Sequence, residues 1–255
     1  MVYGHSEEAR ARGTDLGGRE WANGGGAHRH SETHMPKSPS RSLIAYPNGM
    51  GGTCGANSAC GTYATTLWYA DDLAQRAKHG FVQYQRQDLF GGYYGLTNSP
   101  SAQQALTAEE AVILRPDYWV NFMWKRCLGP NVLNATSSDQ NIRAYAFNGA
   151  PPSPFAAAEC RMAPLQLLLI NLSDKEVRAN VNVGSNYSVW TLTPPAGGPF
   201  AEQVELNSSL LPTVVDTAQH DPIFLEEPPP AIHKTGKGGV ALPAISTTFL
   251  CMAEL

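Results

Sequence analysis

The chain has 255 residues, a formal net charge of −4 and 42% hydrophobic residues, which is the composition of a globular protein with one large or two modest cores. Its few Lys and Arg residues are scattered, so a nucleic-acid partner is not expected. No apolar run is long enough to cross a bilayer, so no transmembrane segment is expected.

Residues 1–46 are rich in Gly, Arg, His, Ser and Pro and show no hydrophobic period. They predict a disordered or unrelated segment, because they bury too little surface to offset the entropy of ordering. The His and Glu side chains at 28–34 resemble a metal-ligand set, but a solvated polar tract is the better interpretation on such a segment. No metal site is predicted, since no cysteine pair has the C-x-x-C spacing of zinc sites.

A glycine-rich loop at 49–55 is followed by a helical pattern at 61–80. The loop lacks the Gly-Lys-Ser/Thr ending of a phosphate-binding loop. In the helix, Asp72 and Arg76 form an i,i+4 pair, and Gly80 ends the apolar period. The tyrosine and tryptophan side chains of this helix are expected in the core.

The next run, 81–90, predicts a strand that ends at a Gly-Gly pair flanked by aromatic residues. The order helix, strand, loop is typical of an α/β barrel, whose loops carry binding groups. Rings and amides on a glycine-hinged loop suit a polyhydroxylated ligand. The alternative is that Tyr93 and Tyr94 only cover the end of a sheet.

A polar connection at 99–115 is expected to contain a short helical piece at 108–114. A second helix is predicted from 116 to 129. Pro116 and Asp117 suit its first turn, Lys125 and Arg126 suit its last turn, and a Gly-Pro pair ends it.

The pattern changes after residue 130 to short strand-like runs separated by Asn, Ser, Pro and Gly. This is typical of an antiparallel β-sandwich. A proline-rich run at 224–230 predicts a connector. The predicted strands are 131–135, 142–147, 165–172, 177–183, 187–192 and 244–252.

Five cysteines leave at least one unpaired. Cys54 and Cys60 could close a small ring, Cys160 and Cys251 could staple the C-terminal region, and Cys127 is the expected spare. Together with four glycosylation patterns, these pairs favour a secreted or lumenal origin. Since no signal peptide is apparent, the true beginning is expected to lie outside this chain. The patterns start at Asn134, Asn171, Asn186 and Asn207.

Three ordered segments resemble the C-terminal part of heparanase and the heparanase-like endo-β-glucuronidases, of the glycoside hydrolase family 79 type. They are residues 62–73, 86–96 and 116–130, followed by 132–133 and 142–146. The resemblance covers roughly residues 47–255. It implies a C-terminal fragment of a (β/α)8 TIM barrel followed by an antiparallel β-sandwich. The implied domains are an unrelated segment at 1–46, incomplete barrel units at 47–130 and a sandwich at 131–255.

By this resemblance, Gln87, Gly92 and Tyr94 line a sugar cleft, and Gly51 and Gly52 match the glycine pair after the family's nucleophile. No cofactor is implied. A glycan or proteoglycan is the implied substrate, and the missing N-terminal barrel portion is a possible partner.

The family's catalytic carboxylates have no counterpart in the chain. Retaining glycosidases need two carboxyl groups, and the family takes its acid/base from a fourth strand that is absent here. Its nucleophile is a Gly-Glu expected near residues 44–47, where the chain has Ile-Ala-Tyr-Pro. The nearest upstream glutamates, Glu20 and Glu32, lie in the unpatterned segment. No catalytic residue is therefore assigned.

Three hypotheses follow. The chain is the C-terminal portion of a heparanase-like hydrolase and is inactive alone, or it is a non-catalytic carbohydrate-binding or interaction module built on the sandwich. As a third possibility, it is a truncated gene product. A secreted, extracellular or lysosomal/vacuolar location is expected.

Overall fold

The computed structural model describes residues 43–45, 59–84, 95–98, 111–181, 186–212, 214–216, 230–235 and 239–253. In that part of the chain, no helix is long and apolar enough to pass through a membrane.

The elements in chain order are β1 (Leu43–Ala45), α2 (Tyr63–Lys78), β2 (Phe81–Tyr84), β3 (Thr97–Asn98), β4 (Ala111–Leu114), α3 (Pro116–Cys127), β5 (Asn131–Leu133), β6 (Ile142–Asn148), α4 (Ala158–Arg161), β7 (Leu165–Asn171), β8 (Val177–Ala179), β9 (Asn186–Thr193), the 3-10 turn η3 (Gly198–Phe200), β10 (Glu205–Leu206), β11 (Ser209–Leu210), β12 (Val214–Asp216), β13 (Ile232–Thr235), β14 (Val240–Leu242) and β15 (Ser246–Met252).

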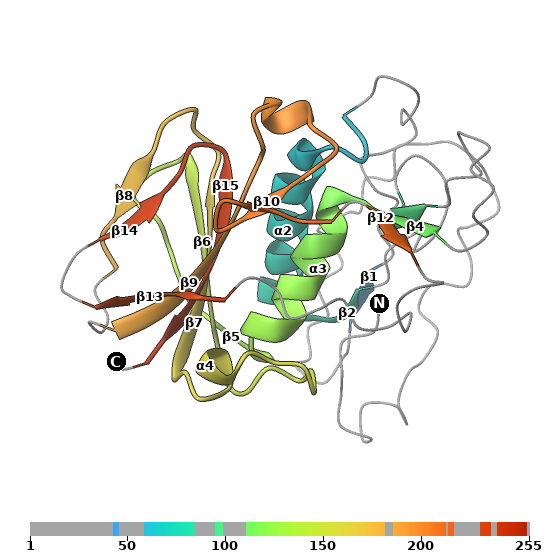
Figure 1. Ribbon diagram of the computed structural model, residues 1–255. Helices are drawn as coiled ribbons and strands as arrows, with labels where there is room; N and C mark the ends of the chain where they lie inside the picture. Colours follow the sequence, from blue (N-terminus) through green and yellow to red (C-terminus); the bar gives the residue numbers. More distant parts are fainter. Residues whose placement is uncertain are drawn as a thin grey trace, which may run out of the picture.

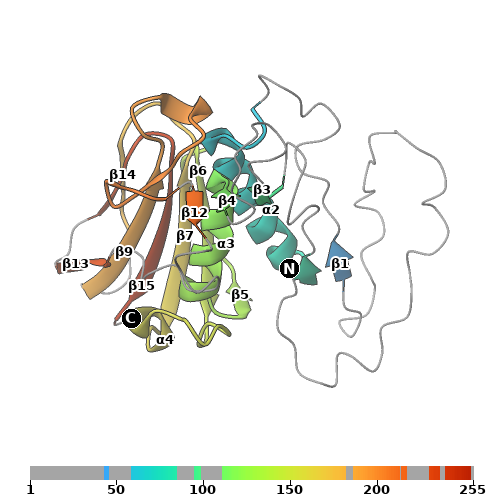
Figure 2. The ribbon, with the colours of Figure 1, turned by 45° about the vertical axis from the view of Figure 1, so that its right-hand side comes forward.

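One antiparallel sheet dominates the structure, with strand order β11-β10-β9-β15-β7-β6-β5 and with β13 also paired to β9. The C-terminal strand β15 lies in its middle, where Phe249 is opposite Trp190 on β9 and opposite Leu168 on β7. Helices α2 and α3 lie side by side on one face, and the pair β8–β14 lies on the other (Figures 1 and 2).

The predicted helix at 61–80 is confirmed as α2. It ends at Lys78 and is followed by Gly80, whose φ of +82° is a left-handed conformation that glycine adopts without a Cβ penalty. Its buried positions recur at helical spacing, so one stripe of the helix faces the sheet. These residues are Tyr63, Thr65, Thr66, Tyr69, Ala70, Leu73 and Ala74.

The second predicted helix is confirmed as α3, with Pro116 in its first turn and basic residues in its last. Gly129 follows it where the backbone of the β6 end comes close. A Cβ at this glycine would collide with the carbonyl oxygens of Asn148 and Gly149. Glycine is therefore required at the end of the helix.

The two faces of the large sheet bury different side chains because strand residues alternate in direction. On β7, for example, Leu168 and Ile170 belong to the core under α2 and α3, whereas Leu167 and Leu169 belong to the core under β8 and β14. Each fully buried aliphatic side chain contributes about 1.5–3 kcal/mol. The helices therefore stabilise the sheet directly, and the core runs across residue 130, the domain boundary expected from the sequence.

Several predicted boundaries change in the structure. The helical piece expected at 108–114 is wrong, since Ala111–Leu114 is a strand that pairs with β12 and β3. Its apolar residues satisfy their backbone by strand pairing, which the local sequence does not reveal. Within the segment expected to lack structure, Leu43–Ala45 forms β1. The short strands between β9 and β15 were not anticipated.

Cys160 and Cys251, the pair proposed from the sequence to staple the C-terminal region, form a disulfide with a Cα–Cα distance of 4.9 Å. It joins the short helix α4 to the central strand β15. Cys127 is free and buried, in agreement with its expected role as the spare cysteine. Cys54 lies outside the described residues.

Candidate functional site

The described part of the chain includes the segments on either side of the predicted sugar-binding loop. Strand β2 ends at Tyr84 and the described chain resumes at Gly95, and both Tyr84 and Leu96 are buried. The backbone amide of Arg115 donates to the Leu96 carbonyl at 3.0 Å, which fixes the far end of this connection to the start of α3. The predicted cleft residues Gln87, Gly92, Tyr94, Gly51 and Gly52 lie outside the described residues.

Strands β1 and β2 form a parallel pair, and α2 connects them along the chain. In parallel α/β folds, catalytic groups lie in the loops that follow the carboxyl ends of the strands. The chain that follows β1 contains no Asp or Glu before Asp71. The first such loop therefore supplies no carboxylate.

The Asp72 carboxylate on α2 takes part in a local network of hydrogen bonds. It accepts bonds from Arg76 Nε at 2.9 and 3.0 Å and from the Tyr84 hydroxyl at 2.6 Å. The Arg76 guanidinium also lies over the rings of Phe81 and Tyr84, an arrangement that attracts a cation to the ring face. This network holds β2 against α2, next to the loop that carries the predicted cleft residues.

Asp71 faces the large sheet instead. The Tyr145 hydroxyl on β6 donates to Asp71 Oδ1 at 2.5 Å, and Arg143 Nε lies 3.9 Å from the same atom. Burial, together with the hydrogen bond to this carboxylate, raises the pKa of Tyr145 above its ordinary value. Neither Asp71 nor Asp72 is thus a free carboxylate. Sequence patterns missed the Tyr145 contact, because its partner is 74 positions away.

Buried polar groups also join α2 and α3. The Tyr69 hydroxyl donates to Asn121 Oδ1 at 2.9 Å. At the start of α3, the buried Arg115 guanidinium lies 3.6 Å from the exposed carboxylate of Glu202. Gly61 packs on this guanidinium, and a Cβ there would approach its Nη1 to 3.0 Å. These contacts set the position of both helices relative to each other.

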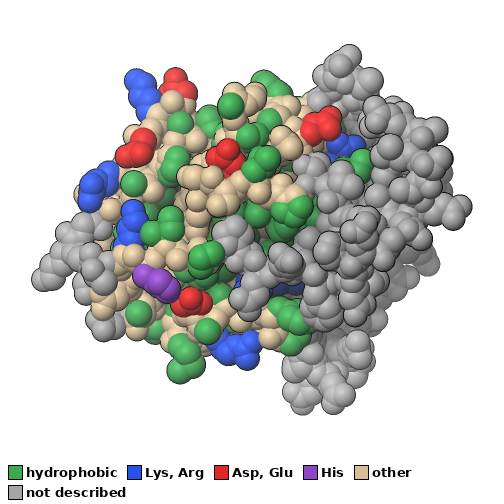
Figure 3. Space-filling view, viewed as in Figure 1, with side chains coloured by type: hydrophobic (Ala, Val, Ile, Leu, Met, Phe, Trp, Pro, Cys, Tyr) green, Lys and Arg blue, Asp and Glu red, His purple; other side chains and the backbone are tan. Residues whose placement is uncertain are grey.

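A cavity of about 180 Å³ lies on the opposite side of the large sheet, beside β9. Its walls include Tyr187, Thr191, Asn207 and Lys234, together with apolar side chains. Hydroxyl and ammonium groups among apolar side chains suit a polar ligand such as a saccharide. Among the described residues on the face seen in Figure 3, charged side chains of both signs are dispersed and form no single patch.

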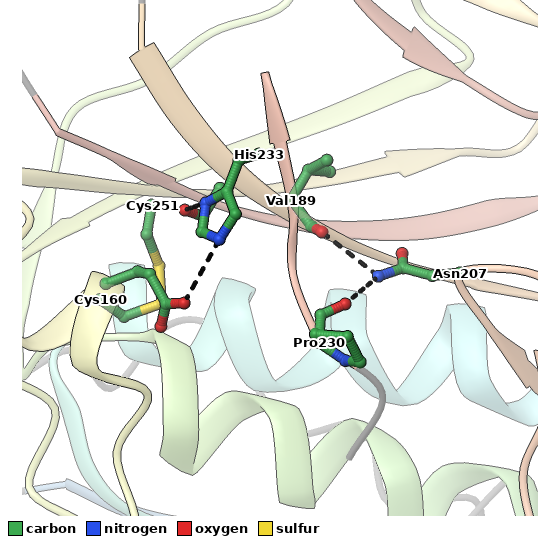
Figure 4. Close-up of polar contacts among 8 residues, drawn as sticks. Cys160, Val189, Asn207, Pro230, His233 and Cys251 are labelled. Carbon is green, nitrogen blue, oxygen red and sulfur yellow. Dashed lines mark hydrogen bonds and ion pairs between the residues drawn. A yellow bond between two sulfur atoms is a disulfide. The ribbon is translucent and has the colours of Figure 1, made fainter. Parts of the chain in front are cut away.

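Side chains near the N-terminal end of the edge strand β13 attach it to its neighbours. His233 Nδ1 lies 2.9 Å from Ser188 Oγ, and its Nε2 lies 3.8 Å from the Glu159 carboxylate. Just before the strand, Asn207 Nδ2 donates to the Pro230 carbonyl at 3.1 Å (Figure 4). Although these groups resemble a catalytic Ser-His-acid set, Ser188 is 6% exposed, so its hydroxyl is not presented to a substrate.

The four glycosylation patterns differ in exposure. Asn134 is exposed. Asn171 is fully buried, and its Nδ2 donates to the carbonyls of Lys175, Leu242 and Pro243. A glycosylation acceptor is expected on a surface loop, and Asn171 does not lie on one. Asn207 accepts from the Thr191 amide and donates to Pro230, so its amide is also engaged.

Comparisons with known proteins find sequence relatives among the heparanase-like proteins. No protein-family model matches the chain. Heparanase-like protein 2 of Arabidopsis thaliana is 31% identical over 120 residues, which are 47% of this chain and 19% of that protein. Heparanase-like protein 1 of the same plant is 31% identical over 135 residues, or 52% of this chain and 21% of that protein. A hyaluronoglucuronidase of Hirudo nipponia is 24% identical over 166 residues, 64% of this chain and 32% of the enzyme.

Among solved structures, similar chains include two glycoside hydrolases. CelM2, a bifunctional glucanase-xylanase from a metagenome library, has a TM-score of 0.45 and 18% identity, over 85% of this chain and 32% of that chain. The catalytic domain of GH30 xylanase C from Talaromyces cellulolyticus has a TM-score of 0.46 and 12% identity. The match covers 82% of this chain and 39% of that domain's chain. Scores at this level carry no conclusion, and the sequence relatives decide the assignment. The chain is a homologue of the heparanase-like proteins over about half of its length, and it spans about a fifth of theirs.

Proposed function

We propose that the chain is the C-terminal portion of a heparanase-like glycoside hydrolase, an endo-β-glucuronidase that acts on glucuronic-acid-containing glycans or proteoglycans. The observation that carries this proposal is the 31% identity to two heparanase-like proteins over about half of the chain. The order β1, α2, β2 and α3, with its parallel strand pair, supports an origin in the last units of a (β/α)8 barrel.

The chain alone is proposed to be inactive. Retaining hydrolysis needs one carboxyl group to protonate the leaving oxygen and a second, about 5 Å away, to attack the sugar. The loop after β1 has no carboxylate, and Asp71 and Asp72 are engaged by Tyr145, Tyr84 and Arg76. The missing N-terminal barrel portion is the proposed partner, because a two-stranded parallel sheet is too small to be stable alone.

An assay of reducing ends tests the inactivity. The purified chain is incubated with hyaluronan and with a glucuronic-acid-containing proteoglycan glycan, and no release above the buffer control is expected. Release that disappears when Glu20 and Glu32 are both changed to Gln would show that the upstream segment supplies the carboxylates. That result would overturn the proposed inactivity.

A second candidate function is non-catalytic carbohydrate binding, which the cavity beside β9 favours. Lys234 in its wall would pair with the carboxylate of a glucuronic acid unit. The test is calorimetric titration of the full chain with glucuronic-acid oligosaccharides, because removing residues 1–130 would uncover the core under α2 and α3. Saturable binding that Lys234→Ala weakens and the exposed-surface control Lys175→Ala does not would support this function. The absence of binding would remove it.

A secreted, extracellular or lysosomal/vacuolar location is proposed with either function. The Cys160–Cys251 disulfide supports an oxidising compartment. The exposed Asn134 is compatible with glycosylation there.

A further inference from the structure

Three cysteine sulfurs gather where α3, α4 and β15 meet. Cys127 is the last residue of α3, Cys160 lies in α4 and Cys251 lies in β15, and their Sγ atoms are all within 4.8 Å of one another. All three side chains are buried. Cys160 and Cys251 are bonded to each other, whereas Cys127 is free. A reduced thiol is thus enclosed together with a disulfide.

The arrangement favours Cys251 as the sulfur that Cys127 would reach. Cys251 Sγ already lies 3.7 Å from the Cys127 carbonyl oxygen, so β15 runs directly against the end of α3. Cys160 belongs to a helix of only four residues, and Met162, the residue that follows this helix, is 83% exposed. Cys160 is therefore the sulfur on the more easily displaced element.

The surroundings keep the free thiol inactive while the site is closed. Burial is the main cause that raises the pKa of Cys127 above its ordinary value, so the thiol stays protonated. Exchange needs the thiolate, because the thiol itself is a poor nucleophile. The disulfide consequently persists beside the thiol until alkaline pH or a local opening of α4 admits water.

We propose that Cys127, Cys160 and Cys251 form an intramolecular thiol–disulfide exchange site that can move the covalent link from α4 to α3. The Cys127 thiolate attacks Cys251 Sγ, a Cys127–Cys251 bond forms, and the Cys160–Cys251 bond breaks. Cys160 leaves as a thiolate and takes up the proton that Cys127 lost. The step involves no net oxidation or reduction and needs no further reactant.

The consequence is a change in what the covalent link joins. With Cys160–Cys251, β15 is tied to α4, which follows β6 within the C-terminal region. With Cys127–Cys251, β15 is tied to α3, the helix proposed to come from the barrel. Exchange would thus lock the barrel helix to the central strand of the sheet and release α4. This inference does not depend on the proposed hydrolase activity.

Peptide mapping without reduction tests the site in the full chain. Cleavage after Arg126, Arg143, Arg161 and Lys237 places the three cysteines on different peptides. The protein is held at several pH values between 7 and 9.5, below its unfolding temperature, then acidified, alkylated and digested. We expect a Cys127–Cys251 peptide and alkylated Cys160, formed at a rate that is independent of protein concentration. The rate should rise about tenfold per pH unit while the thiol remains mostly protonated.

Two variants distinguish exchange at these three cysteines from unspecific disulfide exchange among all cysteines of the chain. Cys127→Ser should keep Cys160 and Cys251 paired under every condition. Cys160→Ser should yield the Cys127–Cys251 bond during oxidation by air or by a small disulfide. The proposal is overturned if Cys127 stays free across the pH range while the protein remains folded by circular dichroism. It is also overturned if Cys127 pairs with Cys54 and Cys60 as often as with Cys251.

Discussion

The Tyr84 hydroxyl on β2 lies 2.6 Å from the Asp72 carboxylate on α2. The preceding residue, Asp71, accepts the hydroxyl of Tyr145 from the large sheet. Two consecutive acidic residues thus bind α2 on one side to the parallel strand pair and on the other side to the sheet. Helix α2 is therefore the element through which β2 is positioned relative to the large sheet.

Replacing Tyr84 with Phe should destabilise the attachment of β2. A hydrogen bond to a charged group contributes about 1.5–3 kcal/mol, so we expect the free energy of unfolding to fall by up to that amount. Urea denaturation followed by circular dichroism measures the change. Asp174→Asn, which alters an exposed carboxylate in another turn, serves as the control. Equal midpoints for Tyr84→Phe and the unchanged protein would contradict the role given to this contact.

The pH dependence of stability should report on Tyr145. Because its folded-state pKa is raised from the ordinary value of 10.0, its contribution is fully present below pH 10. Above that value the unfolded chain loses the proton first, so the free energy of unfolding falls as pH rises. Tyr145→Phe should flatten this decline in urea titrations between pH 8 and 11. Superimposable pH curves for the two proteins would argue against it.

Gln166 should be a critical buried residue. Its Nε2 lies within hydrogen-bonding distance of the carbonyls of Gly149, Cys160 and Ala163, and its Oε1 accepts from the Gly129 amide. Gln166→Leu leaves the buried Gly129 amide without its acceptor and removes the Gln166 donor from the buried Ala163 carbonyl, at about 1–3 kcal/mol for each buried group left unsatisfied. We expect a clear fall in thermal midpoint, with the exposed Gln140→Leu as control. A midpoint unchanged in both variants would be the contrary result.

Glycan occupancy should follow the exposure of the acceptor asparagines. In protein made by a eukaryotic secretory host, we expect a glycan at Asn134 and none at Asn171, whose amide is enclosed by three carbonyl partners. Mass spectrometry of peptides before and after enzymatic deglycosylation measures this. A glycan found on Asn171 in folded, monodisperse protein would show that this interpretation of the site is wrong.

The two long helices could be predicted because their signals are local. Gly80 sits at the end of α2, Pro116 and Asp117 start α3, and apolar residues repeat at helical spacing in α2. The long strands β6, β7, β9 and β15 were predicted for the same reason. By contrast, the segment that forms β4 was predicted as a helix. It is a strand because it pairs with β12, about a hundred residues away, and the local sequence does not reveal so distant a partner.

The candidate site was predictable only in part. The Asp72–Arg76 pair follows from i,i+4 spacing and is observed. The contacts Tyr145–Asp71 and Ser188–His233 link distant segments, and no periodicity in the sequence identifies such partners. Gln87, Gly92 and Tyr94 stay predictions that rest on the resemblance.

A chimeric enzyme tests the central claim most directly. In Arabidopsis thaliana heparanase-like protein 2, the matching C-terminal segment is replaced by residues 59–255 of this chain, and release of reducing ends from a glucuronic-acid-containing glycan is measured beside the parent. By the family resemblance, the upstream part would then supply the two carboxylates. The account predicts hydrolysis by the chimera and none by residues 59–255 alone. A folded chimera that is inactive on a glycan the parent cleaves would contradict it.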